Sequence, residues 1–292
     1  MSDRPPTIDS LAAKRWLSQK PDTSPWLHEE VGRRMVERLG WIVAKPQSWL
    51  SWQPALGGLQ AQALVSALYP DAQRFQQSDI ENSAEIAPEK GAKAWWNPAQ
   101  WLAKPPAFPA QGVGMVWANM ALHPAPDPQA LLAHWHSRLA IDGFLMFSCL
   151  GPDTLMELRA LYARRGWPAP AHEFTDMHDW GDMLVQAGFA EPVMDMERIE
   201  LTFATPQRLL QELRELGRNL HAARHPGMRG RVWLGHLHLA LAELAVPGLE
   251  GQLKLTFEIV YGHAYKPQPK LKVAPETAIS LQDMREHLHK RP

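Results

Sequence analysis

Histidine is the residue type that could perform the widest range of chemistry in this chain. The chain has 13 histidines but a single cysteine, Cys149. Two pairs, His134 with His136 and His236 with His238, are each spaced two residues apart on predicted helices. Side chains two apart do not share a helix face, whereas metal-binding pairs on helices are three or four apart. The histidines therefore indicate structural roles and no metal site. Cys149 follows an apolar stretch, which favours a core thiol over a nucleophile.

The spacing of apolar residues indicates which elements must position any reactive group. Leu27, Val31, Met35 and Leu39 recur every four residues and predict a helix over 26–39. Thr154 starts another predicted helix and has capping-box spacing to Glu157. The other predicted elements are strands near 49–52, 74–77, 113–117, 144–148, 193–203 and 252–261, and helices near 58–68, 128–139, 176–184, 206–216 and 229–245. This alternation predicts a three-layer α/β sheet whose ligands bind beyond the carboxyl ends of its strands.

Composition excludes several classes of function. Lys and Arg number 30 and Asp and Glu 31, so the charge balance gives no case for a nucleic-acid or membrane binder. No apolar run approaches the length of a membrane span, and the first residues have no apolar signal core, so a cytoplasmic location is expected. Residues 1–25 are expected to form a flexible arm and 267–292 a basic, proline-containing tail.

A run of motifs from residue 117 onward resembles a known enzyme family. The motifs are Trp117–His123, Asp142–Ser148, Gly151–Leu155 with Glu157–Arg159, Phe174–Asp179, Ala187–Phe189, Leu213–Gly217 and Thr256–Ala264, together with Glu30–Arg34 near the amino terminus. They resemble the class I S-adenosylmethionine-dependent methyltransferases, and in particular the malonyl-acyl-carrier-protein O-methyltransferases of biotin synthesis. The resemblance covers roughly 26–266. It implies a seven-stranded, Rossmann-like methyltransferase sheet with a helical lid, in which about 41–150 form the cofactor half and about 151–266 the lid and substrate half.

The expected cofactor loop departs from the pattern of this family. The family has an acidic residue at the end of its first strand, and alignment on Leu50 puts Ser51 there. Gln53 and Ala55 replace the first two glycines, with Pro54 between them, which offers no N–H donor. By resemblance, the remaining cofactor-binding candidates are Gly57, Gly58, Asp79 and Asn119. The cofactor implied is S-adenosyl-L-methionine, and the eroded loop predicts that it binds weakly or not at all.

The resemblance also implies how a substrate would be held. The methyl acceptor would be the malonyl carboxylate on an acyl carrier protein, already ionised at neutral pH, so positioning replaces acid–base catalysis. Arg159 and Arg214 are the candidates for a bidentate contact to a carboxylate, and Tyr261 and His263 for the border of the substrate channel. Asn119 and His123 would lie beside the methyl donor as positioning groups. For each of these residues, an ordinary helix-face, strand-end or loop-capping role is the alternative.

Three interpretations of function remain open at this stage, and the least constrained of them is a protein of the methyltransferase fold that uses a different ligand. In the first, the chain is an active O-methyltransferase whose carrier protein docks on a basic patch, for which the candidates are Arg33, Arg34, Arg164, Arg165, Arg229 and Arg231. In the second, it is a catalytically inactive binding or assembly protein that keeps the fold and lid and has lost the cofactor site. The segment 51–58 is the feature that distinguishes them.

Overall fold

The computed structural model describes residues 8–18, 23–80, 87–88 and 107–269. The strands are β1 (Ser48–Trp52), β2 (Gln73–Gln77), β3 (Ala87–Pro88), β4 (Val113–Ala118), β5 (Leu139–Leu150), β6 (Ala190–Phe203) and β7 (Leu253–Tyr265). The helices are α1 (Ser10–Leu17), α2 (Trp26–Leu39), α3 (Pro54–Gly57), α4 (Leu59–Leu68), α6 (Pro128–Arg138), α7 (Met156–Arg164), α8 (Met177–Gln186), α9 (Pro206–Leu216) and α10 (Arg231–Leu241), with two 3-10 turns at Ala242–Leu244 and Pro247–Leu249.

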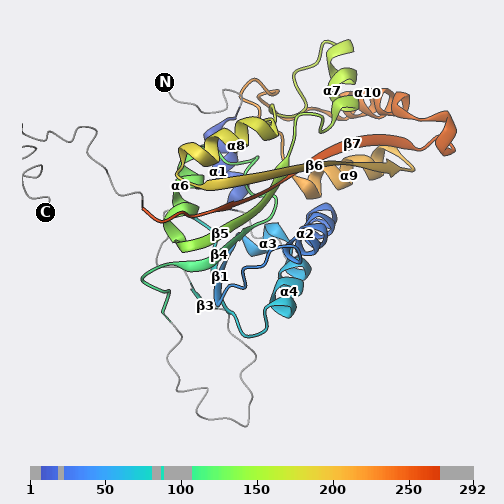
Figure 1. The fold of residues 1–292 in the computed structure, drawn as a ribbon. Helices are drawn as coiled ribbons and strands as arrows, with labels where there is room; N and C mark the ends of the chain where they lie inside the picture. Colours follow the sequence, from blue (N-terminus) through green and yellow to red (C-terminus); the bar gives the residue numbers. More distant parts are fainter. Residues whose placement is uncertain (1–7, 19–22, 81–86, 89–106, 270–292) are drawn as a thin grey trace, which may run out of the picture.

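The strands form one mixed sheet in the order β3-β2-β1-β4-β5-β7-β6 (Figure 1). β2, β1, β4 and β5 are parallel neighbours, whereas β7 runs antiparallel to both β5 and β6. β3 has two residues and pairs antiparallel with β2. Since β1 is followed by β2 on one side and its other neighbour is β4, the strand order switches between β1 and β4. The predicted α/β fold is thus confirmed.

Helices cover both faces of this sheet, because its inner strands are apolar on both sides. Trp49 of β1 and Trp117 of β4 belong to the core under α2 and α4, and Leu50 and Val116 to the core under α6 and α8. Strands buried on both faces read as continuous apolar runs instead of alternating ones. This explains why the short runs at 113–117 and 144–148 mark the middle of the sheet.

The amino-terminal segment differs from the expected flexible arm over its described part. Asp9 accepts hydrogen bonds from the backbone N–H groups of Leu11 and Ala12 and so caps α1. The Asp9 carboxylate also lies 2.8 Å from Arg224, and the backbone N–H of Asp9 donates to the Leu220 carbonyl. α1 is therefore attached to the distant segment 220–224. The predicted tail from 267 lies, from residue 270 onward, outside the described residues.

The start of α7 also differs from the sequence prediction. The helix begins at Met156, after Leu155 in a left-handed conformation with φ of 58°. The Thr154 hydroxyl donates to the Glu258 carbonyl, and Glu157 accepts from the N–H and hydroxyl of Thr256. The predicted capping box is wrong, because both of its side chains bind β7 instead.

Candidate functional site: the carboxyl edge of the sheet

A cavity of about 870 Å³ lies beyond the carboxyl ends of β1, β2 and β4. Its wall includes Trp52 and Gln53 at the end of β1, Asp79 after β2, and Ala121 after β4. Residues of α1 line it as well, among them Lys14. The cavity occupies the switch in strand order, where open α/β sheets bind ligands, and its volume is in the range of small-molecule sites.

The turn between β1 and α4 keeps a glycine-like backbone without the glycine. Gln53, which the resemblance aligns with the first loop glycine, adopts a left-handed conformation with φ of 46° and ψ of 60°. Its N–H donates to the Gln77 carbonyl at 2.8 Å and so is not available to a ligand. Pro54 follows at the first position of α3 and has no N–H. This turn therefore lacks two of the backbone donors that an open glycine loop presents.

The two glycines of the turn, Gly57 and Gly58, have different roles. A Cβ on Gly57 would lie 3.2 Å from the carbonyl oxygen of Asn119, so the neighbouring segment leaves almost no room for one. Gly58 has φ of +109°, which side-chain-bearing residues rarely adopt. Both glycines thus shape the turn, whereas the residues that line the cavity are its neighbours Trp52 to Leu56.

Ser51 and Asp79 lie differently with respect to the cavity. Ser51 is buried and accepts a hydrogen bond from Gln62 Nε2 at 2.5 Å, and it is absent from the described lining. Asp79 belongs to the lining, close to the end of β2. Gln77, the last residue of β2, is buried and donates to the Asp79 carbonyl at 2.8 Å. Asp79 is therefore the candidate carboxylate at this end of β2.

Asn119 is a brace between three segments. Its Nδ2 donates to the carbonyl oxygens of His28 in α2, at 2.7 Å, and of Gly57. Its Oδ1 accepts from the Ser148 hydroxyl at 2.6 Å, and that hydroxyl accepts from Met120 N–H. These contacts use both donors of the buried amide, so the predicted role beside a methyl donor has no free Nδ2 hydrogen to work with.

We expect Asn119→Ala to lower the free energy of unfolding by about 2–4 kcal/mol, because it leaves the buried carbonyls and the Ser148 hydroxyl without this partner. Urea denaturation would measure the loss. Ser137→Ala is the matched control, because that exposed hydroxyl bonds only to its own helix. A loss no greater than that of the control would contradict the bracing role.

A second, smaller cavity of about 290 Å³ adjoins the segment after β4 and contains His123. Its wall is largely apolar, with Met120, Leu158 and Phe257 among its residues. Burial lowers the pKa of His123 well below its usual value, and the nearby imidazoles of His172 and His28 lower it further. A neutral His123 can give one hydrogen-bond donor and one acceptor to a bound group but no positive charge.

Three histidines line this cavity and are held neutral. Burial lowers the pKa of His28 to about 4, and its Nδ1 lies 2.7 Å from the Leu56 carbonyl, to which it donates. Burial also lowers the pKa of His172 to about 4, and its Nε2 donates to the His123 carbonyl at 3.0 Å. Within the described part of the chain, Nδ1 of His123 and of His172 have no hydrogen-bond partner.

The four substrate-binding candidates separate into distinct environments. Arg214 lines the second cavity. Arg159 lies on α7 and donates from Nη2 to the Pro152 carbonyl. His263 packs against Phe144 and Tyr265, with ring centroids 5.4 and 4.7 Å away, and burial lowers its pKa. Of these residues, only Arg214 borders one of the cavities described.

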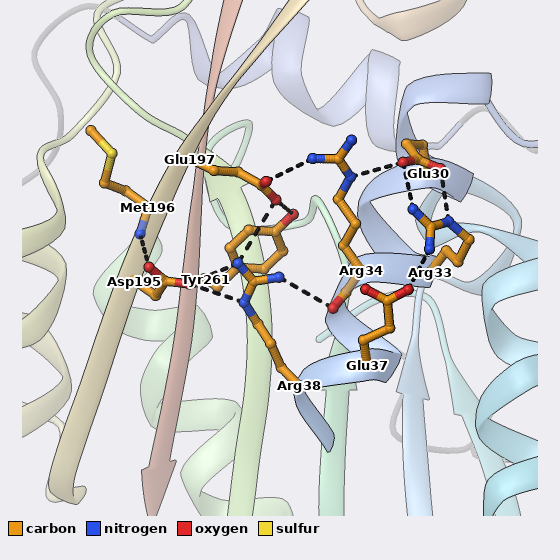
Figure 2. Close-up of polar contacts among 9 residues, drawn as sticks. All are labelled: Glu30, Arg33, Arg34, Glu37, Arg38, Asp195, Met196, Glu197 and Tyr261. Carbon is orange, nitrogen blue, oxygen red and sulfur yellow. Dashed lines mark hydrogen bonds and ion pairs between the residues drawn. The ribbon is translucent and has the colours of Figure 1, made fainter. Parts of the chain in front are cut away.

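Tyr261 belongs to an ionic network between α2 and β6 (Figure 2). Its hydroxyl donates to Glu197 at 2.5 Å, and the guanidinium of Arg38 stacks 3.8 Å from its ring centroid. Arg34 pairs with the same Glu197 at 2.6 Å, and Arg38 pairs with Asp195 at 2.7 Å. Burial raises the pKa of Tyr261, and the Glu197 carboxylate adds to the shift. The network ties α2 to the sheet.

The predicted basic patch divides into three groups. Arg33 and Arg34 are paired with Glu30 on their own helix (Figure 2). Arg164 and Arg165 at the end of α7 are both near Glu243. Arg229 and Arg231, in contrast, line a third cavity of about 460 Å³ together with Arg214 and Arg224. Arg224 was not among the residues predicted from the sequence, although it lies only five residues before Arg229.

The described residues contain neither a membrane-spanning helix nor a group of metal ligands. None of the described helices is long and apolar enough to cross a membrane. The same residues contain no group of three or more histidine, cysteine or acidic side chains placed to hold a metal ion. Burial raises the pKa of the Cys149 thiol.

The strand order and the cavity at its switch define an open α/β protein with a ligand-binding site beyond the carboxyl ends of its strands. The chain is 38% identical over 277 residues to malonyl-acyl-carrier-protein O-methyltransferase from Gallionella capsiferriformans. The aligned residues cover 90% of this chain and 93% of that relative. The chain is 36% identical over 265 residues to the protein of the same name from Laribacter hongkongensis, covering 86% and 87%. The chain therefore belongs to the malonyl-acyl-carrier-protein O-methyltransferase family.

Other comparisons add little to this assignment. No family model matches the chain. Among solved structures, the YcgJ protein from Bacillus subtilis gives a TM-score of 0.47 at 9% identity, covering 82% of this chain and 99% of that one. A SAM-dependent methyltransferase from Archaeoglobus fulgidus gives 0.39 at 14% identity, covering 82% and 94%. Similarity this distant says nothing about substrate or activity.

Proposed function

We propose that the chain transfers a methyl group from S-adenosyl-L-methionine to the free carboxylate of a malonyl group on an acyl carrier protein. The observation that carries the proposal is the cavity of about 870 Å³ at the switch between β1 and β4. It occurs in a chain 38% identical to a relative that bears this activity in its name. In this proposal the protein works in the cytoplasm.

Three features of the cavity suit an adenosyl group. The left-handed backbone at Gln53 gives the turn the conformation that a glycine would otherwise supply. Asp79 offers a carboxylate near the end of β2, where it would accept hydrogen bonds from the ribose hydroxyls. Leu56 and Leu131 offer apolar surface to the base. These are the residues that would hold the cofactor.

Two other features weaken such binding. The N–H of Gln53 is bonded to Gln77, and Pro54 contributes no N–H. The Ser51 hydroxyl is engaged by Gln62. Each hydrogen bond that is not formed to a ligand costs roughly tenfold in affinity. We therefore infer that the cofactor binds more weakly than it would to an intact glycine loop.

The chemistry itself asks little of the protein. S-adenosyl-L-methionine supplies an electrophilic sulfonium methyl when bound, and the malonyl carboxylate is a nucleophile at neutral pH, so no general base is needed. The protein must orient the carboxylate and exclude water. The apolar wall around Leu158 and Phe257 excludes water, and Arg214 at its border supplies positive charge for the acidic substrate.

We also propose that α7, α9 and α10 act as a helical lid over the substrate cavity. α7 lies in the connection between β5 and β6, and α9 and α10 lie in the connection between β6 and β7. Residues of α7 and α9 line the cavity that contains His123. In this proposal the cofactor half is at about 41–150 and the lid and substrate half at about 151–266. The sheet is taken as the seven-stranded sheet of the family, with β3 as its short edge strand.

A second candidate is a catalytically inactive member of the family that binds a partner. The observation that favours it is that the N–H of Gln53 is already hydrogen-bonded within the protein and that Pro54 beside it has no N–H. Binding and methyl transfer distinguish the two candidates. Only the active enzyme must bind S-adenosyl-L-methionine and transfer its methyl group.

We expect calorimetric titration with S-adenosyl-L-methionine to give measurable binding that Asp79→Asn weakens about tenfold, since a charged hydrogen-bond acceptor is lost. Asp71→Asn, an exposed residue before β2, is the control. A radiolabelled methyl-transfer assay with malonyl-acyl-carrier protein, and complementation of a biotin auxotroph, test the reaction. Absence of both binding and transfer would favour the inactive candidate.

A further inference from the structure

The third cavity, of about 460 Å³, is lined by cations. Its charged lining residues are Arg214 at the end of α9, Arg224 and Arg229 on the following loop, and Arg231 at the start of α10. Among the described residues that line it, none is acidic. Uncompensated like charges around one concave site repel one another, so the arrangement favours an anionic ligand.

The arginines differ in how they are compensated. Arg224 pairs with Asp9 at 2.8 Å. Arg229 is partly buried and stacks on the ring of Trp233 with its guanidinium carbon 4.0 Å from the ring centroid. In the described part of the chain, Arg214, Arg229 and Arg231 have no acidic partner. A partly desolvated guanidinium held on an aromatic ring without a counterion gains most from an anion that enters the cavity.

The backbone adds to the positive electrostatic field of this cavity. Gly230 precedes the 11-residue helix α10 without a side-chain cap, so the first N–H groups of the helix lack that partner. Gly227 and Gly230 both line the cavity. The positive end of the α10 dipole thus lies beside the arginines.

This cationic cavity adjoins the apolar one that contains His123. Tyr162, Pro170, Arg214 and Asn219 line both. α7 and α10, which flank the cationic cavity, pack against each other, as Figure 1 shows. A ligand with an anionic group and an extended, largely uncharged arm would fit the pair, with the anion among the arginines and the arm directed past Tyr162.

We propose that the cationic cavity binds a phosphate ester, namely the phosphodiester through which a pantetheine arm is attached to its carrier protein. Several guanidinium groups around one cavity suit a phosphate ester, because its tetrahedrally arranged oxygens can accept hydrogen bonds from more than one arginine and pair with arginine in a bidentate way. The identity of the ester rests on the proposed function, in which a carrier-bound thioester is the substrate. The anion site itself rests on the residues above.

Titrations of the full-length protein with three probes test the proposal at low ionic strength. Pantetheine 4′-phosphate is expected to bind at least about tenfold more tightly than pantetheine, and inorganic phosphate is expected to bind more weakly than pantetheine 4′-phosphate. Arg229→Gln and Arg231→Gln should each reduce the advantage of the phosphorylated probe. Arg208→Gln is the matched control, because Arg208 is an exposed residue of α9 paired with Glu212.

Equal binding of pantetheine and pantetheine 4′-phosphate would overturn the proposal. Inorganic phosphate that binds as tightly as pantetheine 4′-phosphate would overturn the role of the arm. The titrations contain no methyl donor, so an arginine-dependent preference for the phosphorylated probe supports this site even if methyl transfer fails. The exposed side chain of Arg231 can be replaced without disturbing the core, and thermal melting of each variant checks that it is folded.

Discussion

The triple variant Gln53→Gly/Pro54→Ser/Ala55→Gly is expected to bind S-adenosyl-L-methionine roughly 10- to 100-fold more tightly than the parent chain. The turn between β1 and α4 already follows a left-handed path at Gln53, so glycine there removes a side chain without asking for a new backbone conformation. Replacing Pro54 restores an N–H at the first position of α3. The variant thus gains donor capacity and close backbone approach.

The gain in binding should come with a small loss of stability. Glycine in place of Ala55 and the loss of the fixed φ of Pro54 make the unfolded chain more flexible and should together lower the free energy of unfolding by about 1–2 kcal/mol, whereas glycine in place of the left-handed Gln53 relieves backbone strain. Calorimetric titration and urea denaturation measure the two effects separately. Gln47→Gly, in the exposed loop before β1, is the control for added glycine alone. If the triple variant binds no more tightly than the parent, the loop is not what limits affinity.

Local sequence patterns predicted the helices well, because the bounds of a helix depend mainly on residues that are near one another in the sequence. The four-residue apolar spacing from Leu27 to Leu39 predicted a helix over 26–39, and α2 has those bounds. Asp176 and Thr205 cap α8 and α9 at the predicted starts. The failure at Thr154 has the opposite origin. Its hydroxyl and the Glu157 carboxylate bond to β7, about 100 residues later in the chain, and no short-range pattern contains that partner.

The site residues were harder to predict, because a residue type does not reveal its partners. Asn119 follows a buried strand, a position equally suited to a ligand contact and to a brace, and its partners His28 and Ser148 lie far away in sequence. Tyr261 likewise pairs with Glu197 of the neighbouring strand. α1 depends on Asp9 and Arg224, 215 residues apart. Long-range pairs of this kind decide whether a polar group faces a cavity or the protein.

A fall in pH from 7 to 5 is expected to cost the protein roughly 4 kcal/mol of unfolding free energy through two histidines alone. Burial lowers the pKa of both His28 and His172 from 6.5 to about 4 in the folded chain, and each is about 5% exposed. Between those pH values the unfolded chain binds more protons than the folded one. The stabilisation is therefore complete above about pH 6.5 and is lost progressively as the pH falls toward 4, by about 2 kcal/mol per histidine at pH 5.

The Glu30 carboxylate of the α2 network does not obscure this effect. Hydrogen bonds from Arg33 and Arg34 lower the pKa of Glu30 to about 2, so its contribution is complete above its unfolded value of 4.5 and is lost only below it. A pH of 5 lies above that range. The drop between pH 7 and 5 thus reports mainly on groups that titrate as imidazoles do.

Urea denaturation at pH 7 and pH 5 measures the drop, and the difference between the two pH values is the quantity compared among variants. His172→Gln should shrink that difference by about 2 kcal/mol, because the variant has no imidazole to protonate on unfolding. His28→Gln should do the same, whereas His236→Gln, at an exposed position on α10, should leave the difference unchanged. The comparison holds even if a variant is less stable at both pH values. A pH difference in His172→Gln equal to that of the parent would mean that water reaches this imidazole and that the cavity beside His123 is not dry.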